Sequence, residues 1–142
     1  MAVAPIVKYD AFIDELSKAG HNLATAVFKA ALTNTAPGAA DTVWNTTVAP
    51  PPAAANGYPA GGNTLTTSSA ATTAGVFKLV LADSVFTATA GGIGPFRYVI
   101  IYNSSATNKV VAKIDNGASV TLADTDTFTS DFDATNGFLT VQ

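Results

Sequence analysis

The sequence predicts a mainly β protein: an antiparallel β-sandwich, jelly-roll-like or immunoglobulin-like, with one short N-terminal helix. Two observations predict this class. From Gly75 onward, short segments rich in β-branched and aromatic residues alternate with Gly- and Asn-containing turns, and one segment alone has a helical period. A closed barrel is the alternative architecture. At 142 residues the chain is one domain, long enough to bury a core.

The helix is predicted over Tyr9 to Gly20. Asp10 is the expected N-cap, and Gly20 is placed to end the helix. A helix of this length is marginal alone, so we expect its apolar stripe to dock on a sheet face. The stripe follows i, i+3, i+4, i+7 spacing and consists of Tyr9, Phe12, Ile13 and Leu16.

Seven or eight strands are expected after the helix. The Asn116-Gly117 pair predicts a two-residue hairpin, because a type I′ turn needs positive φ at both positions. The expected strands are Val27–Leu32, Val76–Leu81, Ser84–Thr89, a stretch opened by Pro95-Phe96 and running through Tyr102, Val110–Asp115, Ala118–Leu122, Thr127–Phe132 and Phe138–Val141.

Residues 39–75 show the least regular pattern. Asp41 is placed to cap a single helical turn bearing Trp44, and the Pro50-Pro51-Pro52 run excludes a helix or central strand. An extended Pro/Gly/Ala-rich loop or arm is expected over residues 48–64, and long loops of this kind are usually functional, disordered or held by a partner. With few Lys residues to protect the sheet edges, we expect an edge to be covered by a loop or a partner subunit.

Composition narrows the function classes. The chain has no cysteine, which excludes disulfides and thiolate metal sites, and its single His21 excludes sites that need two imidazoles. Charged residues make up 12% and the net charge is −3, so a nucleic-acid-binding surface is not expected. No apolar run is long enough for a membrane span, and Met1–Lys8 lacks the layout of a secretory signal.

The patterns that resemble chemical sites are weak. His21 is a lone imidazole without a recognisable triad context. Asp124, Asp126, Asp131 and Asp133 resemble a calcium loop, but the turn glycine is one position late and no Glu stands at the twelfth position. In a strand, Asp131 and Asp133 would share one face and could hold a cation, although a solvated turn and strand face is the favoured interpretation. We therefore expect no enzyme, no cofactor and no metal.

The glycines of Gly91-Gly92-Ile93-Gly94-Pro95 resemble a nucleotide-binding motif only superficially, because a third glycine is missing and a proline-led strand follows. We expect this segment to be a flexible connection between strands.

Several segments, in order along most of the chain, resemble a family of small tailed-bacteriophage virion proteins. The segments are Phe28 to Pro37 (FKAALTNTAP), Asn56 to Gly62 (NGYPAGG), Phe77 to Asp83 (FKLVLAD), Gly92 to Tyr98 (GIGPFRY) and Asp126 to Phe132 (DTFTSDF). The resemblance implies a capsid decoration, or cement, protein: a β-rich domain that binds the assembled head from outside. It implies the major capsid protein as partner, a homo-oligomer (trimer or dimer), and a location on the capsid exterior after synthesis in the bacterial cytoplasm.

Within this interpretation, the Pro/Gly/Ala-rich arm is the expected contact with capsid or a sister subunit, together with Met1–Lys8. Proline fixes the backbone in advance and lowers the entropy lost on binding. The expected partner-binding residues are Pro50, Pro51, Pro52, Asn56, Gly57, Tyr58 and Pro59. Two alternatives stay open. One is a phage tail or head–tail junction component, and the other is a carbohydrate-binding module that uses Trp44, Tyr58 and Tyr102, although aromatic residues at such positions are more often core.

Overall fold

The computed structural model describes residues 5–142, so Met1–Ala4 of the expected N-terminal contact segment lie outside the described residues. In that range the chain is mainly β, with one α-helix near the N-terminus, as predicted. The elements, in order, are β1 (Ile6–Lys8), α1 (Asp10–Ser17), β2 (Phe28–Thr33), β3 (Asn63–Thr64), β4 (Thr67–Thr73), β5 (Val76–Leu81), β6 (Ser84–Thr87), β7 (Ile93–Asn103), a 3₁₀ turn η1 (Ser104–Ala106), β8 (Lys109–Leu122), β9 (Thr127–Ser130) and β10 (Leu139–Val141).

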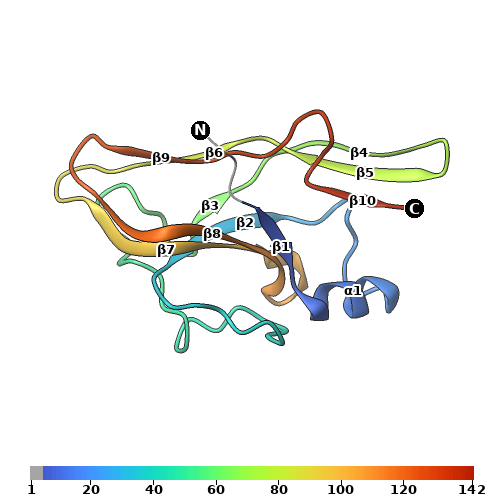
Figure 1. The fold of residues 1–142 in the computed structure, drawn as a ribbon, viewed down its shortest axis with the longest axis horizontal. Helices are drawn as coiled ribbons and strands as arrows, with labels where there is room; N and C mark the ends of the chain where they lie inside the picture. Colours follow the sequence, from blue (N-terminus) through green and yellow to red (C-terminus); the bar gives the residue numbers. More distant parts are fainter. Residues whose placement is uncertain (1–4) are drawn as a thin grey trace.

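The strands form two layers (Figure 1). A five-stranded sheet has the order β1-β8-β7-β2-β3, and all its neighbours are antiparallel. Two smaller antiparallel sheets, β10-β5-β4 and β6-β9, lie side by side over one of its faces. The arrangement is sandwich-like, and the strands do not close into a barrel.

The core lies between the layers and extends to the opposite face of the five-stranded sheet. On β7, Phe96 packs edge-on against Phe128 of β9, with ring centroids 5.0 Å apart. Farther along the same strand, Tyr102 packs against Trp44, which comes from the long loop after β2 (centroids 4.9 Å apart). From Val99 to Asn103 every residue of β7 is buried, so both faces of this part of the strand are covered. This coverage explains its run of aromatic and β-branched residues.

Helix α1 is shorter than predicted. It begins at Asp10 after an uncapped Tyr9 and ends at Ser17, so Asp10 is not the N-cap and Gly20 is not the terminator. The left-handed residue after the helix is Ala19, with φ 61°. The expected docking is confirmed in part: Tyr9 and Phe12 are buried and the helix packs on β8, but Ile13 is 55% exposed.

The Asn116-Gly117 hairpin is a wrong prediction. The two expected strands around it form one continuous strand, β8, which pairs with β7 along almost its whole length. Gly117 has positive φ (82°) within an irregular stretch where the register shifts between the Phe96–Val120 and Tyr98–Asp115 pairs. The positive φ that Gly117 favours thus occurs in a bulge, without a positive φ at Asn116. The chain reverses after Asn103, where η1 joins β7 to β8.

Residues 39–75 contain more structure than the sequence indicates. Strands β3 and β4 were not predicted, because Thr67–Thr73 (TSSAATT) has no alternation of apolar and polar residues. Asp41 does not cap a helical turn: its carboxylate accepts the Gly38 N–H (2.8 Å), and Val43 forms an isolated bridge with Lys109. The segment Ile93–Pro95, expected to be a flexible connection, is the first part of β7.

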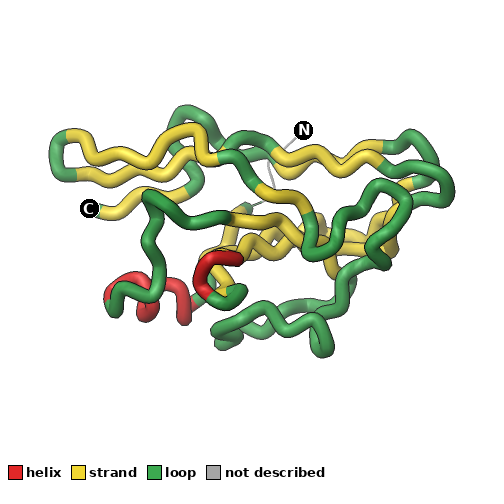
Figure 2. The backbone as a smooth tube through the Cα atoms, turned by 180° about the vertical axis from the view of Figure 1, so that it is seen from behind, coloured by secondary structure: helices red, strands yellow, loops and turns green. Residues whose placement is uncertain are grey.

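Most of the other predicted strands are present with ends shifted by no more than three residues. The β4–β5 hairpin turns at Ala74 and Gly75, both with positive φ (50° and 80°), and runs out past the five-stranded sheet above α1 (Figures 1 and 2). The first part of the long loop between β2 and β3 lies on the side of that sheet away from the two small sheets (Figures 1 and 2). Its last part reaches β6 of the small-sheet layer, where Tyr58 stacks on Phe86.

Candidate partner-binding surface

The 48–64 loop is folded onto the body of the protein, and Tyr58 is its main anchor. Tyr58 is 3% exposed and stacks on Phe86 of β6. Its hydroxyl accepts a hydrogen bond from the Leu32 N–H (3.1 Å), at a point of β2 that β3 does not reach, because β3 pairs only with Lys29 and Ala30. Burial raises the pKa of Tyr58 to about 12, so the phenol stays neutral. The expected covering of a sheet edge by a loop is thus present at β2.

Two glycines let the loop backbone lie directly on the strands. Gly62 (φ 83°) is placed so that a Cβ would overlap the Ala30 carbonyl of β2, and a Cβ on Gly57 (φ 90°) would overlap the Thr87 carbonyl of β6. Next to Gly57, the Asn56 side chain donates to the Gly92 carbonyl (3.1 Å). The loop is therefore held against β2 of the five-stranded sheet and β6 of the two-stranded sheet, and it has a defined shape.

The outer side of this loop is exposed and uncharged. The Pro50 carbonyl accepts a hydrogen bond from the Thr33 hydroxyl (2.9 Å), while the Pro50 ring is exposed; Pro51 and Pro52 are half-buried. We call the exposed residues together the loop surface; they are Val48, Pro50, Ala53, Ala54, Ala55, Asn56, Gly57, Pro59 and Ala60. This surface has no titratable group, so it can act by shape, apolar contact and backbone hydrogen bonding.

The sequence-predicted contact residues fall into three groups, of which the half-buried Pro51 and Pro52 form one. Pro50, Asn56, Gly57 and Pro59 lie on the loop surface, whereas Tyr58 is buried and serves the interior. Val48 and the alanines of the loop surface were not among the predicted contacts. Buried and exposed residues follow no regular spacing in this loop, so the sequence has no periodic pattern that separates the exposed residues from the buried Tyr58.

The aromatic residues considered for sugar stacking all lie in the core. Trp44, Tyr58 and Tyr102 are buried, and the indole Nε1 of Trp44 donates to the Ala49 carbonyl (3.1 Å). The Tyr102 hydroxyl donates to the Gly61 carbonyl (2.7 Å). With their faces covered by neighbouring side chains, these three rings do not form an accessible stacking platform, and the interpretation of them as core residues is confirmed.

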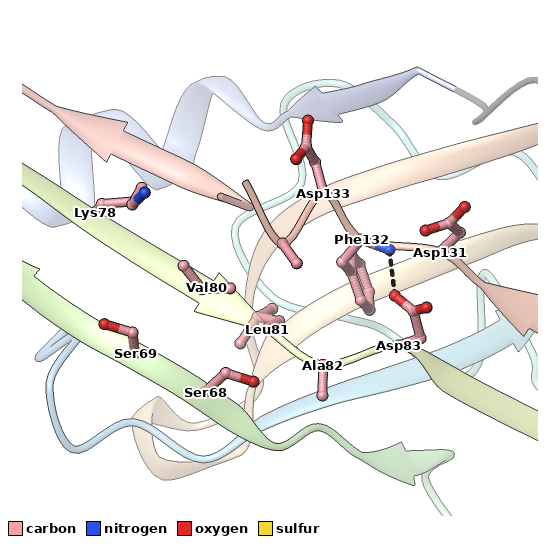
Figure 3. A pocket seen from close by; sticks show the side chains of 11 residues that line it. Ser68, Ser69, Lys78, Val80, Leu81, Ala82, Asp83, Asp131, Phe132 and Asp133 are labelled. Carbon is pink, nitrogen blue, oxygen red and sulfur yellow. Dashed lines mark hydrogen bonds between the residues drawn. The ribbon is translucent and has the colours of Figure 1, made fainter. Parts of the chain in front are cut away.

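A hollow of about 920 Å³ lies where β5 leaves the three-stranded sheet (Figure 3). It opens to solvent between β4, β5 and the segment after β9, and carboxylates of Asp83, Asp131 and Asp133 stand along one side. Asp83 accepts the Phe132 N–H (2.8 Å) and so has a structural role. Strand β9 ends at Ser130, so Asp131 and Asp133 do not share a strand face.

Three of the four acidic residues of the calcium-like pattern, Asp124, Asp126 and Asp133, accept hydrogen bonds from backbone N–H groups. Asp133 accepts the N–H groups of Thr135 and Asn136 (both 2.8 Å), and the Asn136 bonds lower the pKa of the Asp133 carboxyl. Asp126 accepts the Ala123 N–H within the β8–β9 connection (2.9 Å), and Asp124 accepts the Ala90 N–H from the neighbouring β6–β7 connection (2.7 Å). Among residues 5–142, no three His, Asp or Glu side chains are grouped so as to hold a metal ion.

His21 is buried behind α1, with its ring 5.0 Å from that of Phe12. The Asn103 amide oxygen accepts the Ser105 N–H (3.0 Å), so its Nδ2 is the group that faces His21 Nδ1 (3.2 Å). Nδ1 is then the acceptor, and the ring proton sits on Nε2, which has no hydrogen-bond partner within the described chain. Within residues 5–142, no hydroxyl group forms a hydrogen bond with this imidazole.

Comparison of the chain with protein-family models, with curated proteins and with solved structures finds no match. No helix between residues 5 and 142 is long and apolar enough to cross a membrane.

Proposed function

We propose that this protein is a bacteriophage capsid decoration protein, which binds the outside of the assembled head and stabilises it through contacts that span capsid subunits. The observation that carries the proposal is the loop surface: an exposed, uncharged patch whose backbone is fixed in advance by prolines and by the Tyr58 anchor. Such a surface loses little conformational entropy when a protein partner covers it.

The sequence resemblance to small virion proteins supports the same proposal, since three of the resembling segments build this region. FKAALTNTAP contributes β2 and the start of the loop, NGYPAGG contributes the anchor and both close-approach glycines, and GIGPFRY contributes Gly92, which accepts the Asn56 side chain. These segments, far apart in the chain, contact one another around the loop.

Binding to assembled heads stabilises them by mass action. A ligand that binds only the assembled state stabilises it by about 2.7 kcal/mol per site when its free concentration is 100 times Kd. Because a head offers many such sites, the stabilisation per site adds up to a large stabilisation of the whole head, even when each contact is small. The proposal therefore needs a preformed surface and does not need a catalytic pocket.

The test uses heads that lack the protein. Purified wild-type protein is added back, bound protein is measured by co-sedimentation, and DNA release is followed on heating. We expect wild type to bind and to raise the release temperature. The Ala54→Glu variant, which places a charge in the loop surface, should bind at least about tenfold more weakly. Ala24→Glu, an equally exposed alanine in the connection between α1 and β2, is the matched control.

Equal binding by wild type and Ala54→Glu would reject the loop surface as the contact. Failure of wild type to bind heads at all would reject the decoration function. The tail or head–tail junction alternative predicts a low copy number relative to the major capsid protein, whereas decoration predicts a number comparable with that of capsid subunits. Quantitative densitometry of purified virions separates the two.

A further inference from the structure

Strand β4 has an open edge within residues 5–142. It is the last strand of the β10-β5-β4 sheet, it pairs with β5 alone among the described strands, and six of its seven residues are exposed. In an antiparallel pair, every second residue turns its N–H and C=O away from the partner strand. Across the two-residue Ala74-Gly75 turn, the flanking residues Thr73 and Val76 are paired. Because such flanking residues bond to each other, Ala70 and Thr72 are the ones whose backbone groups point outward.

This edge has none of the usual protection against strand pairing. Natural edge strands carry Lys or Pro, are very short, or are covered by another segment. Thr67–Thr73 contains only Thr, Ser and Ala, and its one irregularity lies at its beginning, between Thr67 and Ser69. The regular part, Ser69–Thr73, extends along the protruding hairpin, clear of the five-stranded sheet (Figures 1 and 2).

We propose that two copies of this chain associate through β4, antiparallel and about a twofold axis at Ala71, to form one continuous six-stranded sheet. In this register Ala71 faces Ala71 of the partner copy, Ala70 faces Thr72 and Ser69 faces Thr73. The outward groups of Ala70 and Thr72 then form about four backbone hydrogen bonds across the axis. Centring on Ala71 keeps every pair within the regular part of the strand and leaves out the irregular Thr67–Ser69 stretch.

A second copy fits this edge better than a charged partner segment does. The facing side chains are all small, so the two strands can approach to the normal spacing of about 4.8 Å without steric conflict. Lys78, which pairs with Ala71, is the one charged residue within β4 and β5. Across the axis the two Lys78 positions would be three strand spacings, about 14 Å, apart. That separation exceeds the Debye length of about 8 Å at physiological salt, so no like-charge repulsion opposes the pairing.

The experiment uses the isolated full chain, so its result does not depend on capsid binding. Analytical ultracentrifugation over a range of concentrations should show a reversible dimer. Because the chain has no cysteine, single cysteines report the register. Ala71→Cys should form an intermolecular disulfide on oxidation, since directly facing Cβ atoms lie within reach.

Ser69→Cys is the matched control on the same strand and the same face. Its two copies would be four residue positions apart along the strand, about 14 Å, which is too far for a disulfide. We expect a dimer in solution, with a disulfide crosslink in the Ala71→Cys variant and none in the Ser69→Cys variant. A monomer at every concentration, or equal crosslinking at both positions, would overturn the proposal.

A charge pair gives an independent readout. Ala71→Lys and Ala71→Glu should each weaken self-association about tenfold or more, because like charges would face each other at the axis. An equimolar mixture of the two should recover dimers, which a folding defect cannot produce. Unchanged dimerisation of either variant alone would count against pairing at β4. Ala24→Lys, exposed and distant from β4 in sequence, controls for added charge.

Discussion

The imidazole of His21 is 6% exposed and lies against Phe12 and Asn103. Burial is the main cause that lowers its pKa from the ordinary value of 6.5, and the charge of Lys109 acts in the same direction, while Glu15 opposes them. A proton on Nδ1 would also turn the Asn103 contact into two facing donors. Lys109 and Glu15 form an ion pair with each other, so the two charges partly offset at the ring.

This lowered pKa makes stability depend on pH in a defined window. The unfolded chain takes up a proton near pH 6.5, whereas folded His21 takes it up only at lower pH. Stability should therefore fall as pH drops from above 6.5 toward the folded pKa. We expect the wild-type free energy of unfolding, from urea titrations between pH 7.5 and 5, to decline in that range. His21→Gln should lose this slope, because the chain has no other histidine; equal slopes in both proteins would contradict the assignment.

At the scale of elements, two glycines with nearly equal φ differ in their surroundings. Gly62 and Gly117 have φ of 83° and 82°. An added Cβ at Gly62 would overlap the Ala30 carbonyl, whereas at Gly117 it would meet nothing within 4 Å. Gly117→Ala should cost about 1 kcal/mol for the left-handed conformation alone. Gly62→Ala should cost about 3 kcal/mol or more, because the loop must also move away from β2.

Chemical denaturation of the two alanine variants checks this difference. Since both substitutions replace a glycine at nearly the same φ, the Gly117 variant serves as the control for the Gly62 variant. Similar losses of stability in both would show that the close approach of the loop to β2 is not what Gly62 provides.

The elements that the sequence predicted well are those whose side chains face a buried layer. Strands such as Val76–Leu81 and Phe28–Thr33 are rich in apolar residues because the core covers them. Strand β4 escaped prediction because no such layer covers it: its small polar residues are exposed, and pairing with β5 alone defines it. The hairpin prediction at Asn116-Gly117 was wrong for a different reason. Positive φ suits both a hairpin turn and a bulge, and the local sequence does not distinguish them.

The sequence marks the 48–64 loop, but it does not show how the loop is organised internally. Prolines and glycines mark the loop. Which side chains anchor it depends on distant partners: Tyr58 meets the Leu32 amide 26 residues away, and Asn56 reaches Gly92 36 residues away. Such contacts form only when the two layers are assembled, and the local sequence does not show them. From the local sequence alone, Tyr58 was therefore predicted to lie at the surface.

At the scale of the whole molecule, the loop after β2 is part of the folded unit. Trp44 packs on Tyr102 of β7, its N–H group bonds to Ala49, and its backbone amide donates to the Asn108 carbonyl (2.9 Å) at the β7–β8 connection. Tyr58 ties the far end of the loop to β2 and β6. The loop thus contributes to the core that covers one face of the five-stranded sheet, and it should not open independently of that sheet.

Trp44 allows this coupling to be measured, because it is the only tryptophan of the chain. Its emission reports whether the loop is docked, while far-UV circular dichroism reports the sheets. If loop and sheets form one cooperative unit, both signals should change with the same midpoint in guanidinium chloride. Gly62→Ala should lower the two midpoints together. A Trp44 transition at clearly lower denaturant than the loss of β signal would instead mean that the loop undocks as a separate arm, and the loop surface would then not be preformed.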